Sequence, residues 1–419
     1  MVMSLNACEL QIDLFCQGLR VPPAVSLEGA RSVLGAPAGL GSGLEIVIPT
    51  GSRLKPAIWV NVPVRERFAQ SSPYVLEGGP GPYQVRDLRT AGIHPIRIPR
   101  RPSWYDRLTS RDVTMGSVGA LRGTALHVSI DPTCAFWDAN ERCLFCATGQ
   151  SVARACESRQ TIEDVVETCW AAKEYSGVTY VQLGGGFHGE RGLRFAEPFV
   201  RAIKQDVGLL VGVQLTPEHD CSAYARLIDA GVDSFSFCVE LLDASWFARI
   251  CPGKAHRIGQ PLFFKAMDYC ASRLQRGAVS GEVIAGLEPI GNTIEAIERI
   301  VAAGAYPIVG IFRPLAGSAL EDWPPPRFEE MREVMRAMYD ACRRARLPIG
   351  VAPNLEVSLS VTPEDAAMLA PRNAAFYRYE LWRLAARIAA RPVFGARLRA
   401  RPRRIPVEPG AGPGAAGPA

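Results

Sequence analysis

Three closely spaced cysteines are the residues of this sequence whose type and spacing most clearly indicate chemistry. Cys134 is followed by eight residues, and Cys143 and Cys146 are separated by two, so that all three fall within 13 residues. They follow the short apolar run 126–130, which predicts a strand, and therefore lie in the loop at its carboxyl end. Thiolates are the usual ligands of iron–sulfur clusters. Three of them predict a [4Fe–4S] cluster with one iron left open for chemistry.

Other sites and roles are compatible with the same cysteines. A structural zinc ion would be held by these three cysteines and one histidine, with His127 or His188 as the fourth ligand. Cys143 and Cys146 alone, as a Cys-x-x-Cys pair, would form a redox-active dithiol. An iron–sulfur cluster could also serve in electron transfer or as a scaffold without catalysis. The large α/β domain around the loop favours the catalytic cluster, since structural zinc modules are usually small.

The overall composition is that of an ordinary globular protein. The chain has 419 residues, of which 48% are hydrophobic and 21% charged, with a formal net charge of +5. We find no uncharged apolar stretch that predicts a membrane span, and the first residues lack the basic leader of a signal peptide. We therefore expect a cytoplasmic protein that does not enter a membrane and does not bind nucleic acid. The scattered cysteines elsewhere are expected to pack as small buried side chains.

Alternating strand and helix patterns begin near residue 122 and predict an α/β core over 120–345. Strands are predicted at 126–130, 178–183, 209–215, 234–239, 279–287 and 307–312. Helices are predicted at 161–175, 195–205, 223–230, within 260–273, at 293–303 and at 327–344. Six strand–helix units in sequence predict a parallel sheet, either curved into a partial (β/α)6 TIM-like barrel or open and doubly wound. In both folds ligands bind at the carboxyl ends of the strands.

Further regions flank this core. Residues 1–115 form an N-terminal α+β region of unknown role, rich in glycine and proline, with strand-like runs at 44–48 and 57–62. Residues 346–400 are predicted to be a helical C-terminal extension. Residues 401–419 are rich in Gly, Ala, Pro and Arg and are predicted to be a disordered tail. None of these regions carries a motif that indicates chemistry.

The cysteine loop resembles the cluster loop of the radical S-adenosylmethionine (SAM) superfamily. That family usually has Cys-x3-Cys-x2-Cys directly after the first strand of a biotin-synthase-like barrel, with an aromatic residue before the last cysteine. Here Phe145 holds that position, whereas the first spacer has eight residues in place of three. The resemblance implies that Cys134, Cys143 and Cys146 hold a [4Fe–4S] cluster and that SAM is the second cofactor. If Cys134 is not the first ligand, Cys156 is the nearest substitute.

Motifs at the ends of later strands extend this resemblance to most of the core. The three glycines 184–186 end the second strand, where the family binds the methionine end of SAM. Glu240 ends the fourth strand, where relatives carry a polar residue near the ribose. The motif 283–288 implies contacts to the adenine, and 312–318 resembles the sixth-strand end of biotin-synthase-like members. The implied cofactor-binding residues are Phe145, Gly184, Gly185, Gly186, Glu240, Ile284, Gly286 and Leu287.

The resemblance implies a type of chemistry but no specific reaction. The reduced cluster would cleave SAM to methionine and a 5′-deoxyadenosyl radical, which would remove a hydrogen atom from a small-molecule substrate. A flavodoxin, a ferredoxin or a reductase would donate the electron. The layout also resembles an uncharacterised bacterial radical SAM group encoded beside a nitrilase. Polar candidates for the barrel interior are Tyr180, Gln182, His188, Gln214 and Arg313, none with an assigned catalytic role.

Overall fold

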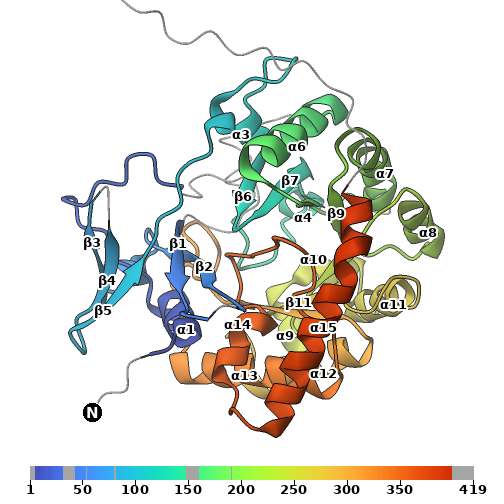
Figure 1. The fold of residues 1–419 in the computed structure, drawn as a ribbon. Helices are drawn as coiled ribbons and strands as arrows, with labels where there is room; N and C mark the ends of the chain where they lie inside the picture. Colours follow the sequence, from blue (N-terminus) through green and yellow to red (C-terminus); the bar gives the residue numbers. More distant parts are fainter. Residues whose placement is uncertain are drawn as a thin grey trace, which may run out of the picture.

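The computed structural model describes residues 5–31, 43–52, 54–79, 82–147, 160–189 and 191–398. Within these ranges the central feature is a curved seven-stranded sheet (Figure 1). Its strands lie in the order β12-β11-β10-β9-β8-β7-β6. Its parallel strands are β7 (Ala125–Asp131), β8 (Tyr180–Gly185), β9 (Leu210–Gln214), β10 (Ser234–Glu240), β11 (Val279–Ala285) and β12 (Tyr306–Ile311). At one edge β6 (Gly119–Arg122) pairs antiparallel to β7. The strand order follows the sequence without a reversal, so the predicted partial barrel is confirmed and the doubly wound alternative is wrong.

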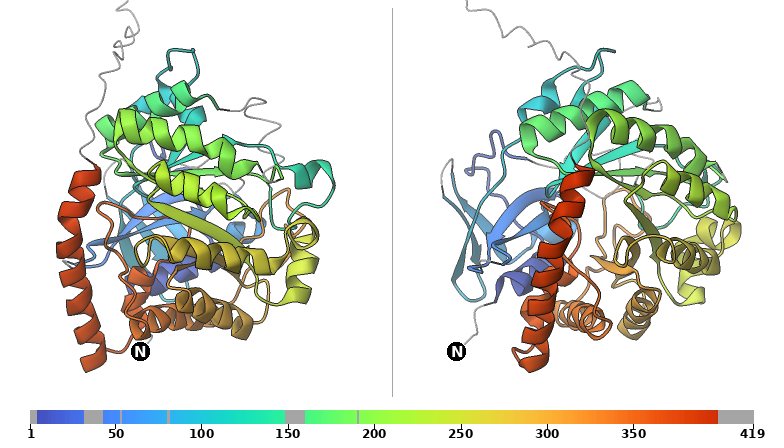
Figure 2. Two further views of the ribbon diagram at one scale, coloured as in Figure 1. Left: turned by 90° about the vertical axis from the view of Figure 1, so that its right-hand side faces the viewer. Right: turned by 45° about the vertical axis from the view of Figure 1, so that its right-hand side comes forward.

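Helices follow one another along the outer face of the curved sheet, as the two views of Figure 2 show. They are α6 (Ile162–Ser176), α7 (Gly192–Ala202) with the π-turn η2 (Ile203–Val207), α8 (Cys221–Asp229), α11 (Gln260–Ala271), α12 (Ile290–Ala302) and α13 (Phe328–Arg344). Two short helices, α9 (Ala244–Ile250) and α10 (Pro252–Arg257), lie instead against the loop that follows β7. The helices predicted for the core are all present. The short helices α9 and α10, between β10 and α11, are additional to the prediction.

The local sequence explains why these elements form where they do. At the start of α6 the Thr161 side chain accepts a hydrogen bond from the backbone three residues later, at 3.2 Å. Gly177 ends the helix with a left-handed φ of 63°. Along β8 the alternation of a strand buries Val181 and Leu183 under the helices and turns Gln182 towards the barrel interior. The positions of the inward-facing residues therefore follow from strand periodicity.

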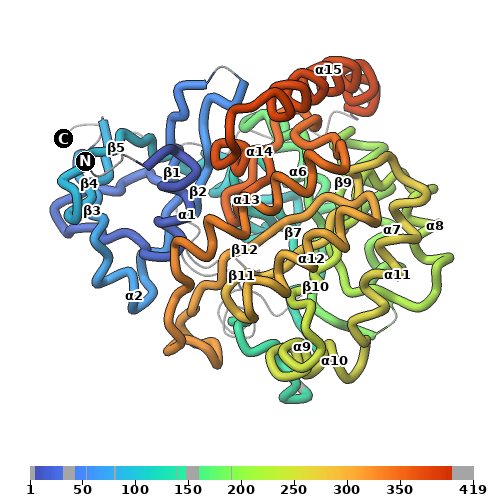
Figure 3. Tube along the Cα trace, turned by 90° about the horizontal axis from the view of Figure 1, so that it is seen from below, coloured from blue at the N-terminus to red at the C-terminus, as the bar shows by residue number. Residues whose placement is uncertain are grey.

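The N-terminal region packs beside the barrel, as the view from below shows (Figure 3). Its described elements are α1 (Ala7–Gln17), β1 (Gly43–Pro49), β2 (Ala57–Pro63), α2 (Arg67–Gln70), β3 (Tyr74–Gly78), β4 (Tyr83–Asp87), β5 (Gly92–Ile96), η1 (Ser103–Asp106) and α3 (Met115–Val118). The antiparallel pair β1–β2 confirms two predicted strands. The helix α1 and the sheet β3-β4-β5 are additional. Cys8 and Cys16 on α1 are buried free thiols, as expected for packing cysteines.

The chain between α13 and the C-terminal helices closes the open side of the half barrel. The Thr124 N–H, just after β6, donates to the Glu356 carbonyl at 2.9 Å, and Val361 forms an antiparallel bridge with β12. The Asn61 N–H of β2 donates into the same segment at 2.7 Å. Residues 354–361, named here the closing segment, therefore join the first strand of the sheet to the last.

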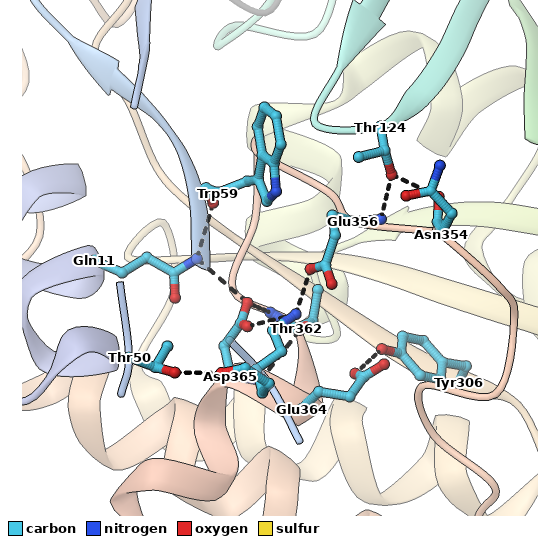
Figure 4. A network of polar contacts seen from close by, with 11 residues as sticks. Gln11, Thr50, Trp59, Thr124, Tyr306, Asn354, Glu356, Thr362, Glu364 and Asp365 are labelled. Carbon is cyan, nitrogen blue, oxygen red and sulfur yellow. Dashed lines mark hydrogen bonds and ion pairs between the residues drawn. The ribbon is translucent and has the colours of Figure 1, made fainter. Parts of the chain in front are cut away.

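A buried polar network holds the closing segment to the N-terminal region (Figure 4). Lys55, which precedes β2, forms ion pairs with Glu356 and, at 3.1 Å, with Asp365. Gln11 of α1 donates to the same Asp365 carboxylate at 3.4 Å. The barrel, the N-terminal region and the chain after α13 are therefore packed as one unit.

The C-terminal helices are α14 (Pro363–Ala366), the 3-10 turn η3 (Ala367–Leu369) and α15 (Ala374–Arg397). The helix α15 lies along the edge of the barrel at the amino ends of the strands. Near its start the Tyr379 hydroxyl donates to the Leu347 carbonyl at 2.7 Å. Near its end Arg397 pairs at 3.0 Å with Asp233, which immediately precedes β10. This helix therefore helps to cover the edge opposite the cysteine loop.

The predicted helical extension at 346–400 contains these helices and, before them, the non-helical residues 346–362. The predicted disordered tail at 401–419 lies outside the described residues. Among the helices of the described ranges, none has the length and apolar character needed to span a bilayer.

Candidate functional site

A cavity of about 630 Å³ occupies the inside of the half barrel. Its wall includes inward-facing residues of the sheet, the loops at the carboxyl ends of the parallel strands, part of the closing segment and residues near the amino ends of the strands. Cys134, Cys143 and Cys146 all line it, as do Phe145 and the three glycines at the end of β8. The cysteine loop therefore opens into a single space of the size used for small-molecule binding.

The eight-residue spacer of the cysteine loop contains a single helical turn, α4 (Ala135–Asp138), for which Cys134 is the N-cap residue. Phe136 in this turn stacks on Phe187, which follows β8, with ring centroids 4.3 Å apart. The same ring lies close to Gly253, where an added Cβ would come within 2.4 Å of it. The longer spacer thus forms a packed turn, and the cysteines on either side of it reach the same cavity.

Gly186 allows Cys134 to approach the end of β8. A Cβ on Gly186 would lie 2.0 Å from the Thr133 carbonyl oxygen and 2.5 Å from the Cβ of Cys134. In this position the Phe187 N–H donates to the Cys134 Sγ at 3.4 Å. At Gly184, by contrast, the nearest atom to an added Cβ is 3.8 Å away. The sequence predicts that the glycines bind SAM, and the structure adds that one of them makes room for Cys134.

Cys143 lies beside a fourth cysteine that is distant in the sequence. The Leu144 N–H donates to the Ile250 carbonyl at 2.9 Å, which places the loop against the junction of α9 and α10. There the Cys251 thiol donates a hydrogen bond to Cys143 and lowers the pKa of the Cys143 thiol. No spacing in the sequence connects Cys251 with the cysteine loop, so only the fold reveals this contact.

Glu240 and Lys254 form a buried ion pair in the cavity wall. Lys254 Nζ lies 2.6 Å from Glu240 Oε1 and also donates to the Cys238 carbonyl at 3.1 Å. Burial by itself disfavours the charged amine, but the Glu240 carboxylate and the nearby thiols of Cys143, Cys238 and Cys251 together hold the pKa of Lys254 well above its ordinary value. Glu240 has a left-handed φ of 67° where β10 ends. The predicted polar residue at this strand end is therefore present as half of an ion pair.

The fifth-strand motif lies partly in the cavity wall. Ile284 lines the cavity, whereas Gly286 and Leu287 are not among the lining residues that the structure describes. Gly286 has a φ of 97°, and an added Cβ would meet the Pro326 ring at 2.3 Å, so its role is to let the chain turn. Leu287 is buried. The contact of this motif with the adenine of SAM stays a prediction.

Polar side chains form a layer across the middle of the cavity. Glu282 of β11 accepts hydrogen bonds from Gln214 Nε2 at 2.5 Å and from the Ser236 hydroxyl. Burial raises the pKa of Glu282 above its ordinary value, which favours the neutral acid. The candidates for the barrel interior that line the cavity are Tyr180, Gln182, Gln214 and Arg313.

The two histidines considered as zinc ligands have other surroundings. His188 Nε2 lies 3.1 Å from Asp131 Oδ1. His127 lines the cavity, and burial lowers its pKa to about 3. Across the described ranges, no group of three or more His, Cys, Asp or Glu side chains is close enough to hold one metal ion. Cys156, the nearest substitute ligand, lies outside the described residues.

Comparisons with known proteins give partial matches. No protein-family model matches the chain. The chain is 24% identical over 133 residues to bacteriochlorophyllide c C-7(1)-hydroxylase of Chlorobaculum limnaeum, a match that spans 32% of this chain and 33% of the hydroxylase. Among solved structures, the match to HydG, a maturase of the [FeFe]-hydrogenase, covers 52% of this chain and 49% of the HydG chain, with a TM-score of 0.43 and 14% identity. The structure of HydG from Carboxydothermus hydrogenoformans covers 48% of this chain and 49% of the HydG chain, with a TM-score of 0.40 and 16% identity.

Proposed function

We propose that this chain is a radical SAM enzyme in which Cys134, Cys143 and Cys146 hold a [4Fe–4S] cluster. The observation that carries the proposal is that all three cysteines open, at the carboxyl ends of parallel strands, into one cavity of about 630 Å³. The curated relative supports membership of the radical SAM superfamily. The curved sheet is also the fold that the resemblance of the cysteine loop implies.

The donor set fits such a cluster. Three thiols suit a four-iron cluster with one open iron, and each ligand of a cluster binds a different iron atom, so the sulfurs need not converge on one point. The Cys134 sulfur already accepts a hydrogen bond from the Phe187 N–H, and the Cys143 sulfur accepts one from the Cys251 thiol. Hydrogen bonds of this kind orient ligand sulfurs and tune the potential of a cluster.

When bound, a reduced cluster supplies the electron that cleaves SAM to methionine and a 5′-deoxyadenosyl radical, which removes a hydrogen atom from the substrate. Gly184 and Gly185 at the end of β8 leave room for the amino acid part of SAM. Glu240, held in place by Lys254, presents a carboxylate oxygen suited to a ribose hydroxyl. Phe145 offers an aromatic face to the adenine. The closing segment helps to enclose the cavity and so limits access of water.

The substrate in this proposal is a small molecule that lies beside SAM. The polar layer of Gln214, Ser236 and Glu282 lines the middle of the cavity. In this proposal these three side chains contact the substrate. Burial raises the pKa of Glu282, so this carboxyl group takes up a proton more readily than an exposed glutamate. A flavodoxin- or ferredoxin-type protein, or a reductase, donates the electron. The hydroxylation named for the curated relative is that protein's activity, and the match spans only a third of its length.

The test uses the full chain, purified and reconstituted with iron and sulfide in the absence of oxygen. After addition of dithionite and SAM, 5′-deoxyadenosine is measured by chromatography and iron by colorimetry. Deoxyadenosine together with about four irons per chain is the expected result. A protein that holds one zinc ion and leaves SAM intact would make the cysteine loop structural. A full cluster without SAM cleavage would make the chain a non-catalytic iron–sulfur protein.

A further inference from the structure

Arg122, the last residue of β6, is a buried cation with no partner among the residues that the structure describes. Its side chain lines the cavity, although the residue is only 1% exposed. Neither Nε nor Nη1 makes a hydrogen bond to any described residue. Burial lowers the pKa of Arg122 to about 10, so the guanidinium is still charged at neutral pH. A buried charge of this kind is costly unless an anion compensates it.

Other buried or half-buried cations of the cavity wall have acidic partners within the described ranges. The pairs are Lys254 with Glu240, Lys55 with Glu356 and Asp365, and Arg313 with Glu66. Glu45 acts electrostatically on Arg122. However, its carboxylate already binds the guanidinium of Arg31 and accepts the Gly123 N–H at 2.7 Å. In the described wall, the positive charge of Arg122 is therefore left uncompensated.

Two more hydrogen-bonding side chains lie on the same inner face of the sheet. Ala120, two residues before Arg122 on β6, pairs with His127 of β7, which in turn pairs with Gln182 of β8. Gln182 Oε1 accepts the Tyr180 hydroxyl, whereas its buried Nε2 has no hydrogen-bond partner in the described structure. Burial and the charge of Arg122 lower the pKa of His127 to about 3, so its ring is neutral and carries one N–H.

We propose that Arg122, His127 and Gln182 bind a carboxylate group of the substrate, which makes the substrate a carboxylic acid. That the bound acid is a substrate rests on the proposed function. That the cavity binds an anion rests on the residues of the cavity wall alone. A guanidinium presents paired N–H groups that match the two oxygens of a carboxylate. A single uncompensated positive charge suits a monoanion, whereas a phosphate dianion would leave a negative charge buried. We name these three residues the carboxylate subsite.

The position of the carboxylate subsite indicates the shape of the acid. Gln182 lies four residues before Gly186, which borders Cys134, and four strand residues span about 13 Å. The amino acid part of SAM is proposed to lie at the glycine end of this distance. The substrate would extend from Arg122 towards the polar layer around Glu282. An acid with an extended chain of several carbon atoms fits this arrangement.

Thermal unfolding of the reconstituted full chain, without SAM or reductant, tests the carboxylate subsite. Hexanoate is the probe, hexanamide is its uncharged control of equal length, and inorganic phosphate represents a dianion. Arg122→Gln removes the charge, and Arg194→Gln removes an exposed arginine of α7 as the matched control. Hexanoate should raise the unfolding temperature of the wild type and of Arg194→Gln by a few degrees, and this shift should be lost in Arg122→Gln. Hexanamide and phosphate should give no such shift.

Three results would overturn the carboxylate subsite: equal shifts with hexanoate and hexanamide, a larger shift with phosphate, or a hexanoate shift that persists in Arg122→Gln. If Arg122→Gln does not fold, the wild-type comparison of hexanoate with hexanamide still decides. The readout needs no radical chemistry. A wild type that shows the hexanoate shift but forms no deoxyadenosine would refute the proposed function and leave the subsite standing, and the reverse pattern would refute the subsite alone.

Discussion

Replacing Gly186 with alanine should displace Cys134, whereas the same replacement at Gly184 should not. A methyl group on Gly186 would lie 2.0 Å from the Thr133 carbonyl oxygen and 2.5 Å from the Cβ of Cys134. Carbon atoms in contact are normally about 3.5–4.0 Å apart, so the cysteine loop would have to move by at least about 1 Å. At Gly184 the nearest atom would be 3.8 Å away, which is an ordinary contact. The two variants are therefore a matched pair.

The magnitude follows from two opposing effects. Overpacking costs about 1–3 kcal/mol, and the restriction of the unfolded chain by alanine offsets about 0.4–1 kcal/mol of it. We expect Gly186→Ala to lower the free energy of unfolding by about 1–2 kcal/mol and to reduce the iron bound after reconstitution. Gly184→Ala should be neutral or slightly stabilising, with the iron content of the wild type. Urea unfolding followed by circular dichroism and an iron assay measure both, and equal values in the two variants would refute this reasoning.

Three further changes test the electrostatics of the cavity. Lys254→Met leaves the Glu240 carboxylate buried without its partner and should lower the free energy of unfolding by about 3–5 kcal/mol, with recovery in the double variant with Glu240→Gln; urea titrations check both. Burial lowers the pKa of His127 from 6.5 to about 3, so the unfolded chain binds the extra proton in this window. Stability should therefore fall as pH falls from 6.5 to 3, by up to about 1.4 kcal/mol per unit from this group, and His127→Gln should flatten that slope in urea titrations at a series of pH values. Arg122→Met removes an uncompensated buried charge and should raise the unfolding temperature of the ligand-free protein in calorimetry; a lower temperature would indicate an undetected anionic partner.

Local patterns in the sequence suffice to predict the barrel. Each parallel strand has a buried apolar run, and the helices between strands carry recognisable ends, such as Thr161 and Gly177 around α6. The carboxyl ends of parallel strands share one edge of the sheet, so the loop with Cys134 and the glycines after β8 can be expected to meet. The structure shows this meeting at Gly186. The prediction succeeds here because the residues that determine each element lie within a few positions of it in the sequence.

The α1 helix escapes prediction because polar residues interrupt its apolar pattern. Asp13 is buried on this helix, where it accepts the Tyr74 hydroxyl at 2.7 Å and pairs with Arg89 at the same distance. Tyr74 lies on β3 and Arg89 in the turn between β4 and β5, and both are distant from α1 in the sequence. A buried carboxylate looks like a surface residue until its partners are known, so the burial of α1 depends on contacts that the sequence does not display.

Contacts within the site between distant segments are equally hidden. Cys251 next to Cys143 and Lys254 next to Glu240 come from α10 and its start, a short stretch whose composition does not suggest a site. The closing segment is a loop that gains its role only by joining β6 to β12. Arg122 is one of many arginines, and only its burial without a partner in the described structure sets it apart.

The most direct test of the central claim compares Cys134→Ala with Cys169→Ala. Both remove one thiol, but Cys169 is buried in α6 and does not belong to the described cavity lining. After anaerobic reconstitution, iron content and deoxyadenosine formation from SAM and dithionite are measured side by side. The proposal predicts that Cys134→Ala loses the cluster and forms no deoxyadenosine, whereas Cys169→Ala retains both. A Cys134→Ala protein with the iron content and deoxyadenosine yield of the wild type would contradict the assigned cluster site.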